Sequence, residues 1–112
     1  MNNIFKLAAA TVLSLPLVSS AALSAKAEDV RFLLRNETGV AMTKFQASPS
    51  GLDDWENDIL GSDVLYSGYS SRININDGRT TCIYDLRGVF ADGERVEKYK
   101  VNICKLTSFT FY

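Results

Sequence analysis

The sequence predicts a mainly β fold, a small antiparallel β-sandwich or barrel of six to seven strands with one short helix and one disulfide. Three observations support this prediction. Short segments of alternating apolar and polar residues are separated by turns rich in Gly, Asn and Asp. Only one segment carries apolar residues at helical spacing. Two cysteines follow an amino terminus typical of exported proteins.

Residues 1–27 have the features of a secretory signal peptide. A lysine supplies the positive start, an uncharged apolar run follows, and Ala25 and Ala27 stand three and one positions before a cut ahead of Glu28. An uncleaved membrane anchor is the alternative, because the run approaches the roughly 20 residues that span a bilayer. Ser and Thr interrupt the run and favour cleavage. Residues 28–112 then form a single β-domain with a periplasmic or secreted location.

The composition of these 85 residues excludes several classes of function. Ten basic against 13 acidic residues give a net charge of −3 without a basic cluster, which argues against nucleic acid and anionic membranes as partners. The chain contains no histidine, the usual general base and the commonest metal ligand. We therefore expect neither an enzyme nor a cofactor.

The first half of the domain predicts four strands, over residues 30–36, 40–47, 64–66 and 69–76. The turn between the first two contains Asn and Gly, and the last of the four alternates isoleucines with polar residues, as a half-buried strand does.

A short helix is predicted over residues 52–61. Four apolar residues recur there at helical spacing, acidic residues crowd the first turn, and Gly61 can end the helix. We expect this helix to lie over the sheet and to be pinned by Trp55.

Residues 80–90 and 94–103 give the clearest hairpin, joined by Asp92-Gly93, and a last strand is expected over 107–111. A two-residue turn fixes which positions face each other. The expected pairs are Cys82 with Ile103, Tyr84 with Val101, and Leu86 with Tyr99. All are apolar or aromatic, so this register agrees with a buried face.

Cys82 and Cys104 are expected to form a disulfide, because the domain is small and exported. Two buried free thiols are the alternative, and a zinc site lacks ligands. The hairpin register opposes the bond, since Cys104 would face Thr81 and point away from Cys82. We therefore expect either a bulge, with Gly88 as the candidate, or an end to regular pairing before Cys104.

Acidic residues are concentrated in one segment. They are Asp53, Asp54, Glu56, Asp58 and Asp63. Calcium takes six to eight oxygen ligands, so the four aspartates are weak candidate ligands. The spacing does not match an EF-hand, and a solvated helix start explains the same acids. We assign no metal site on this basis.

Trp55, Tyr66 and Tyr69 form a candidate interaction surface, because exposed aromatic side chains can stack on sugars or anchor a protein partner. The alternative is a place in the hydrophobic core. Trp55 favours the core, whereas the Ser and Gly residues around Tyr66 and Tyr69 leave both interpretations open.

Several segments together carry a resemblance to known sequences. They are Ala47-Ser48-Pro49-Ser50, Asp54-Trp55-Glu56-Asn57-Asp58-Ile59-Leu60-Gly61, Asp63-Val64-Leu65, Cys82-Ile83-Tyr84-Asp85-Leu86-Arg87, Phe90 with Asp92-Gly93, and Val101-Asn102-Ile103-Cys104. Over nearly the whole domain, the chain resembles a family of small exported proteins of unknown function that is common in alphaproteobacteria. The resemblance implies a periplasmic or secreted location and transfers no catalytic residue. Some members carry the label argininosuccinate lyase, which a small domain without histidine does not fit.

The sequence thus predicts an exported binding or interaction module. Its partner is expected to be an envelope or extracellular protein or a glycan, bound at an exposed sheet edge or at the loop of residues 48–63. The alternative is a weak calcium- or glycan-binding domain that uses the acidic, Trp-bearing loop 53–63.

Overall fold

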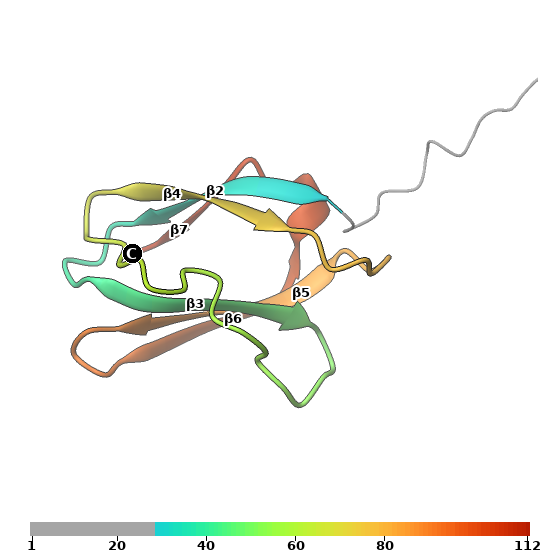
Figure 1. Ribbon diagram of the computed structural model, residues 1–112, viewed down its shortest axis with the longest axis horizontal. Helices are drawn as coiled ribbons and strands as arrows, with labels where there is room; N and C mark the ends of the chain where they lie inside the picture. Colours follow the sequence, from blue (N-terminus) through green and yellow to red (C-terminus); the bar gives the residue numbers. More distant parts are fainter. Residues whose placement is uncertain (1–28) are drawn as a thin grey trace, which may run out of the picture.

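The computed structural model describes residues 29–112, which form two three-stranded sheets packed face to face (Figure 1). The predicted signal peptide, residues 1–27, and its cleavage point lie outside the described residues. The two sheets share no strand, so the predicted sandwich is confirmed and the alternative of a closed barrel is not formed.

The first sheet has the strand order β4-β2-β7. Its central strand β2 (Val30–Asn36) pairs antiparallel with β4 (Ser70–Ile75) and parallel with the short β7 (Ser108–Phe111). The parallel pair departs from the antiparallel pattern of the other strands. It follows from the connection, because β7 is reached from the opposite sheet through the 3-10 helix η3 (Ile103–Lys105) rather than through a hairpin.

The second sheet has the order β3-β5-β6. β3 (Met42–Pro49) and β6 (Arg95–Asn102) both pair antiparallel with the central β5 (Ile83–Phe90). The predicted hairpin between residues 80 and 103 is therefore present as β5 and β6.

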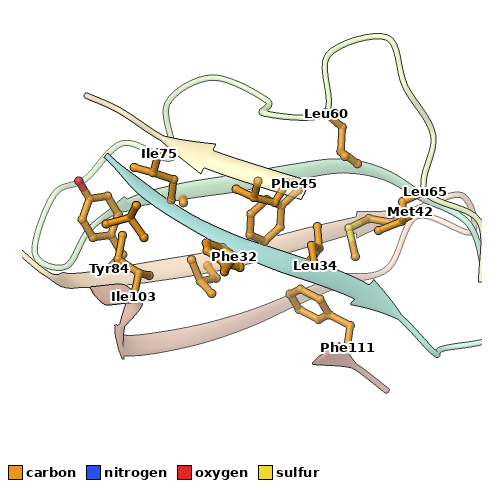
Figure 2. Close-up of a cluster of buried hydrophobic side chains, with 14 of the residues drawn as sticks. Phe32, Leu34, Met42, Phe45, Leu60, Leu65, Ile75, Tyr84, Ile103 and Phe111 are labelled. Carbon is orange, nitrogen blue, oxygen red and sulfur yellow. The ribbon is translucent and has the colours of Figure 1, made fainter. Parts of the chain in front are cut away.

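The core fills the space between the sheets, because alternate residues of β2, β5 and the second half of β4 are buried. The buried apolar side chains are Val30, Phe32, Leu34, Met42, Phe45, Ala47, Leu60, Leu65, Ile73, Ile75, Tyr84, Leu86, Phe90, Ile103 and Phe111 (Figure 2). Phe45 lies among them with its ring centroid 6.3 Å from that of Phe32 and 6.3 Å from that of Phe111, both edge-to-face. Burial of one such side chain contributes about 1.5–3 kcal/mol.

The hairpin loop is one residue longer than the sequence predicted. The Phe90 N–H donates to the Glu94 carbonyl at 2.9 Å, and Gly93 donates back to Phe90 at 2.9 Å. Gly93 has φ of 89°, the left-handed conformation that a three-residue hairpin loop requires at this position.

This longer loop changes the register. Leu86 faces Lys98, so the predicted pair of Leu86 with Tyr99 is wrong. A bulge between Tyr84 and Leu86 then restores the predicted pairing of Tyr84 with Val101.

Gly88 is not the bulge residue. The extra residue lies in β6, where Lys100 has φ of 57° and donates its N–H to the Asp85 carboxylate at 2.9 Å. A Cβ on Gly88 would lie only 3.2 Å from the Phe90 ring and 3.3 Å from the Met42 methyl group. Gly88 therefore allows close packing in the core.

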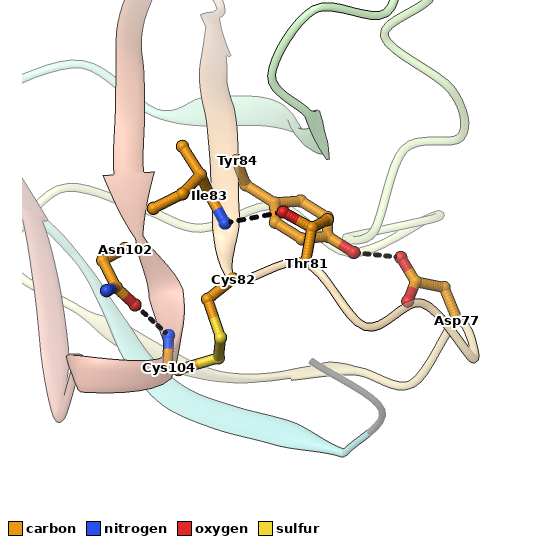
Figure 3. Close-up of a disulfide and its surroundings, with 7 residues drawn as sticks. All are labelled: Asp77, Thr81, Cys82, Ile83, Tyr84, Asn102 and Cys104. Atoms are coloured by element: carbon orange, nitrogen blue, oxygen red, sulfur yellow. Dashed lines mark hydrogen bonds between the residues drawn. A yellow bond between two sulfur atoms is a disulfide. The ribbon is translucent and has the colours of Figure 1, made fainter. Parts of the chain in front are cut away.

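The disulfide between Cys82 and Cys104 is confirmed, with a Cα–Cα distance of 5.4 Å (Figure 3). The Ile103 N–H still donates to the Cys82 carbonyl at 2.9 Å, as the predicted pair requires, but η3 begins at this residue. Successive residues of a 3-10 helix rotate by about 120°, compared with about 180° in a strand. Regular pairing therefore ends before Cys104, and the turn brings its side chain to Cys82.

The helix predicted over residues 52–61 is absent, and the segment is an irregular loop. Several of its polar groups bond to β3 rather than to groups four residues away, as a helix would require. The Phe45 N–H donates to the Asp58 carboxylate at 2.9 Å, and the Ile59 N–H donates to the Phe45 carbonyl at 2.7 Å. The helical spacing was misleading, because Leu60 is buried whereas Leu52 is exposed.

Candidate binding site

The outer edge of β3 is covered by residues 50–69, which we call the covering loop (Figure 1). Leu65 and Met42 exchange two backbone hydrogen bonds, of 2.9 and 3.0 Å, in addition to the bonds that Asp58 and Ile59 make to Phe45. Between Met42 and Phe45, β3 therefore has hydrogen-bonding partners on both sides.

Asn36 anchors the covering loop to the rest of the fold. Its buried side chain donates to the carbonyls of Val40 and Leu65, both at 2.8 Å, and accepts from the N–H and hydroxyl of Thr38 at 3.1 and 2.7 Å. The amide thus uses both donors and its acceptor, and it joins the β2–β3 turn to the carboxyl-terminal part of the loop.

The outer edge of β4 is open. Within residues 29–112, no backbone group of this strand bonds to anything except β2. The other edges are protected, because β6 is bulged and carries Arg95, Lys98 and Lys100, and β7 has only four residues. Charged side chains, bulges and short length are the features that prevent a sheet edge from pairing with another chain, and β4 lacks most of them.

The hydrogen-bonding pattern shows which amides of β4 are unpaired. The Leu33 N–H donates to the Thr107 carbonyl on the β7 side, so the even-numbered residues of β2 bond to β4. In the observed register these residues pair with the odd-numbered residues of β4. The amides of Arg72 and Asn74 therefore point to the open side.

Two clefts border this edge. The first has a volume of about 490 Å³ and is lined by Ala47, Asp54, Glu56, Asn57, Ile59, Asn74, Ile75, Asn76, Asp77 and Arg79. The second has a volume of about 260 Å³ and is lined by Leu60, Asp63, Val64, Leu65, Tyr66, Tyr69, Ser70 and Ser71. They lie at opposite ends of β4, four residues or about 13 Å apart.

An ionic network stabilises the first cleft. The Arg79 guanidinium donates to both carboxylate oxygens of Glu56, at 3.0 and 2.7 Å, and to Asp77 at 3.3 Å. The hydroxyl of the buried Tyr84 donates to Asp77 at 2.5 Å (Figure 3). The covering loop is thus joined to the turn that follows β4.

The network also shifts the pKa values of its members. Burial raises the pKa of the Tyr84 hydroxyl, and the neighbouring Asp77 carboxylate raises it further. Burial opposes ionisation of Asp77, but hydrogen bonds from Tyr84 and Arg79 and the charge of Arg79 together hold its pKa below the usual value. The hydrogen bonds to Glu56 raise the pKa of Arg79. The lining of this cleft contains three acidic residues, Asp54, Glu56 and Asp77, and one basic residue, Arg79.

Three amide side chains in the first cleft are available to a ligand. Asn57, Asn74 and Asn76 line it, are exposed, and have no hydrogen-bonding partner for their side chains among the described residues. The arrangement can offer hydrogen bonds to a polar or cationic group.

Trp55 is not in the hydrophobic core, contrary to the interpretation that the sequence favoured. It is half-buried on the outer face of the second sheet, where the Arg87 guanidinium lies 4.6 Å from its ring centroid and the Tyr99 ring lies 6.4 Å away. It holds the irregular loop, rather than the expected helix, to the sheet through this cation–π contact.

Tyr66 and Tyr69 are exposed, with 61% and 67% of their surface accessible, and both line the second cleft. The structure thus brings these two candidates together and places Trp55 elsewhere.

The acidic residues of the covering loop are dispersed. Asp58 binds backbone amides, Asp54 accepts from the Glu56 N–H at 3.0 Å, and Glu56 pairs with Arg79. Asp53 and Asp63 are exposed. Across the part of the chain that the structure describes, no group of three or more His, Cys, Asp or Glu side chains lies where it could hold a metal ion.

Sequence reasoning missed the Arg79–Asp77–Tyr84 network. A signal for it exists, because an inward-facing tyrosine needs a partner for its hydroxyl. Tyr84 lies on the core face of β5, and the polar turn of residues 76–79 comes only a few positions earlier.

Comparison with known proteins gives no identification: no protein-family model matches the chain, and no curated protein or solved structure matches it significantly. Among the residues that the structure describes, no helix has the length and apolar character needed to cross a membrane.

Proposed function

We propose that this protein is an exported, non-enzymatic binding domain that adds an extended segment of an envelope or extracellular protein to the open edge of β4. The observation that carries this proposal is the contrast between a covered β3 edge and an unpaired β4 edge bordered by two clefts. Strand addition of this kind obtains affinity from main-chain hydrogen bonds and specificity from pockets for alternate side chains.

The clefts define the segment that would bind. The first contains three carboxylates against one guanidinium, which favours a lysine or arginine side chain. The second contains Tyr66, Tyr69 and Val64, which favours an apolar or aromatic side chain. The spacing of the clefts corresponds to positions i and i+4 of an extended chain.

A periplasmic or secreted location is part of the proposal. It rests on the signal-like residues 1–27 and is supported by the disulfide, because such bonds form and persist in oxidising compartments. Mass spectrometry of the exported protein tests it: we expect an amino terminus near Glu28, and a retained leader would contradict it.

Blocking one amide tests the binding mode. The Asn74 N–H points to the open side, so Asn74→Pro removes it while β2 keeps all its bonds, since proline is tolerated on an edge strand. Asn74→Ala is the matched control, which loses the same side chain and retains the N–H. We expect affinity capture from an envelope extract to recover a partner with wild type and Asn74→Ala but not with Asn74→Pro.

Thermal melting of both variants monitors the fold. Recovery of the same partner by a folded Asn74→Pro variant would contradict strand addition. Substitution of Tyr66 and Tyr69 by alanine tests the second cleft separately, and we expect the affinity to fall by about tenfold or more for each aromatic anchor lost.

A glycan ligand is the second candidate, and the unpartnered amides of Asn57, Asn74 and Asn76 in the first cleft favour it. Amides and carboxylates at the rim of a cleft can bond sugar hydroxyls. Calorimetry with cell-wall oligosaccharides tests this: binding that is lost in Asn57→Ala/Asn76→Ala supports it, and the absence of heat with every oligosaccharide excludes it.

A further inference from the structure

The outer face of the first sheet carries three arginines around one leucine. Leu33 lies opposite Arg72 across the β2–β4 pair, and Arg31 and Arg35 lie two residues to either side of Leu33 on β2. All three arginines are exposed. Diagonal neighbours in such a pair are about 7–8 Å apart, so the guanidinium groups are close enough to contact one ligand.

These cations have few anionic partners. Within residues 29–112, Arg35 and Arg72 make no ion pair, and Arg31 pairs only with the solvent-exposed Asp29 at 3.3 Å. An exposed pair of this kind is weak and exchanges readily with other anions. Positive charge is therefore concentrated on one face of a domain whose overall charge is negative.

A groove with an apolar floor lies between two of the arginines. Its volume is about 560 Å³, within the range of small-molecule sites, and its lining includes Arg31, Arg72, Leu33, Leu106 and Thr107. Leu33 and Leu106 are half-buried, and no carboxylate lines the groove. The opposite holds for the cleft beside Arg79, where carboxylates outnumber cations.

We propose that this groove binds one molecule of a free anionic amphiphile of the fatty-acid class. Its carboxylate accepts hydrogen bonds from Arg31 and Arg72, the geometry that guanidinium groups suit best. Its hydrocarbon chain covers Leu33 and Leu106. The groove opens on the face of the sheet and uses the Arg72 side chain, whereas the proposed strand addition uses backbone amides at the β4 edge; Asn74 lines both sites.

Two other occupants fit less well. A membrane surface would meet only three cations on a domain with excess negative charge. A single-stranded nucleic acid requires exposed aromatic side chains for stacking, and the aromatic residue in the lining, Phe32, is buried in the core.

Calorimetry with three probes tests the proposal: decanoate, acetate as the anion without a chain, and octyl glucoside as a neutral amphiphile. We expect one decanoate per protein, with acetate and octyl glucoside at least about tenfold weaker, because a hydrogen-bonded charge and buried hydrocarbon each account for a factor of this size or more. Equal affinity for acetate and decanoate, or for octyl glucoside and decanoate, would overturn the proposal.

Charge variants locate the site. Arg31→Gln/Arg72→Gln should weaken decanoate binding by about tenfold or more. The control is Lys44→Gln/Arg95→Gln, which removes the same charge from exposed residues of the other sheet that make no ion pair within residues 29–112. An equal loss of decanoate affinity in both variants would contradict the assignment of the site. A protein that sediments with phosphatidylglycerol vesicles but does not bind decanoate would also contradict it. Thermal melting establishes that each variant is folded.

Discussion

The edge strands β3 and β4 lie on the same side of the sandwich and differ in their hydrogen bonding. β3 is paired on both sides, because the covering loop bonds to Met42 and Phe45. β4 is paired on one side only and leaves the amides of Arg72 and Asn74 unbonded. An unprotected edge can pair with another chain, and this property is the basis of the proposed strand addition at β4.

The comparison also explains the composition of the covering loop. Acidic residues concentrated in one segment resemble a ligand site in the sequence, but Asp58 and Glu56 hold the loop to β3 and to Arg79. The open surface lies beside these residues, where the loop ends and β4 begins. The stability of the loop and the availability of the β4 edge can therefore be tested separately.

Loss of the Asn36 anchor should have the largest effect on stability. Asn36→Ala removes four hydrogen bonds of about 1 kcal/mol each, and the carbonyls of Val40 and Leu65 retain their other donors, so the free energy of unfolding should fall by about 3 kcal/mol. Urea denaturation measures this. Asn76→Ala is the control, since that side chain is exposed and should contribute less than about 0.5 kcal/mol. Equal effects would show that Asn36 does not anchor the loop.

Removal of the Asp58 carboxylate should uncover the edge of β3. Asp58→Ala leaves the N–H groups of Phe45 and Leu60 without an acceptor, so we expect a loss of about 2 kcal/mol and self-association at high protein concentration. Denaturation and analytical ultracentrifugation measure the two effects. Asp58→Asn keeps the accepting oxygen and should change stability by less than about 1 kcal/mol. If Asp58→Asn loses as much stability as Asp58→Ala, the charge of Asp58 stabilises the loop rather than its hydrogen bonds.

Loss of the Tyr84–Asp77 hydrogen bond should have a smaller effect on stability, and this effect should depend on pH. Tyr84→Phe should lower the free energy of unfolding by about 1 kcal/mol at pH 7. Because the pKa of Tyr84 is raised in the folded protein, its stabilisation is complete below pH 10 and is lost as the pH rises further. Wild type should therefore lose stability above pH 10 by an amount that the variant does not show.

The contribution of Asp77 to stability depends on pH in the opposite direction and is lost at low pH. Its pKa is lowered on folding, so its stabilisation is present above pH 3.8 and is lost as the pH falls below that value. Denaturation at several pH values distinguishes the two groups, and identical profiles for wild type and Tyr84→Phe would contradict the role of the bond.

Six of the seven predicted strands are present, because alternation and turn residues are local signals. The strand expected over residues 64–66 is wrong, since only an isolated bridge from Leu65 to Met42 forms there. The β5–β6 hairpin and the disulfide follow from the Gly93 turn and from Cys82 and Cys104. The register of Leu86 was not predictable, because it depends on whether the Asp92-Gly93 turn has two or three residues.

The covering loop could not be predicted, because its structure is decided by tertiary contacts. A helix over residues 52–61 would satisfy the local pattern, but bonds from Asp58 and Ile59 to Phe45 favour the extended form. Trp55 was expected in the core for its size, and the contact with Arg87 that holds it outside joins residues 32 positions apart. The edge position of β4 likewise cannot be recognised from the sequence, because it depends on the order of the strands in the sheet.

Amide hydrogen exchange of the free protein, followed by NMR at individual residues, tests the contrast between the edges most directly. We expect the amides of Met42 and Phe45 in β3 to be protected by the covering loop, and those of Arg72 and Asn74 in β4 to exchange at close to the rate of an unstructured chain. Strong protection of Arg72 and Asn74 in the free protein would contradict an open β4 edge, and with it the proposed mode of binding.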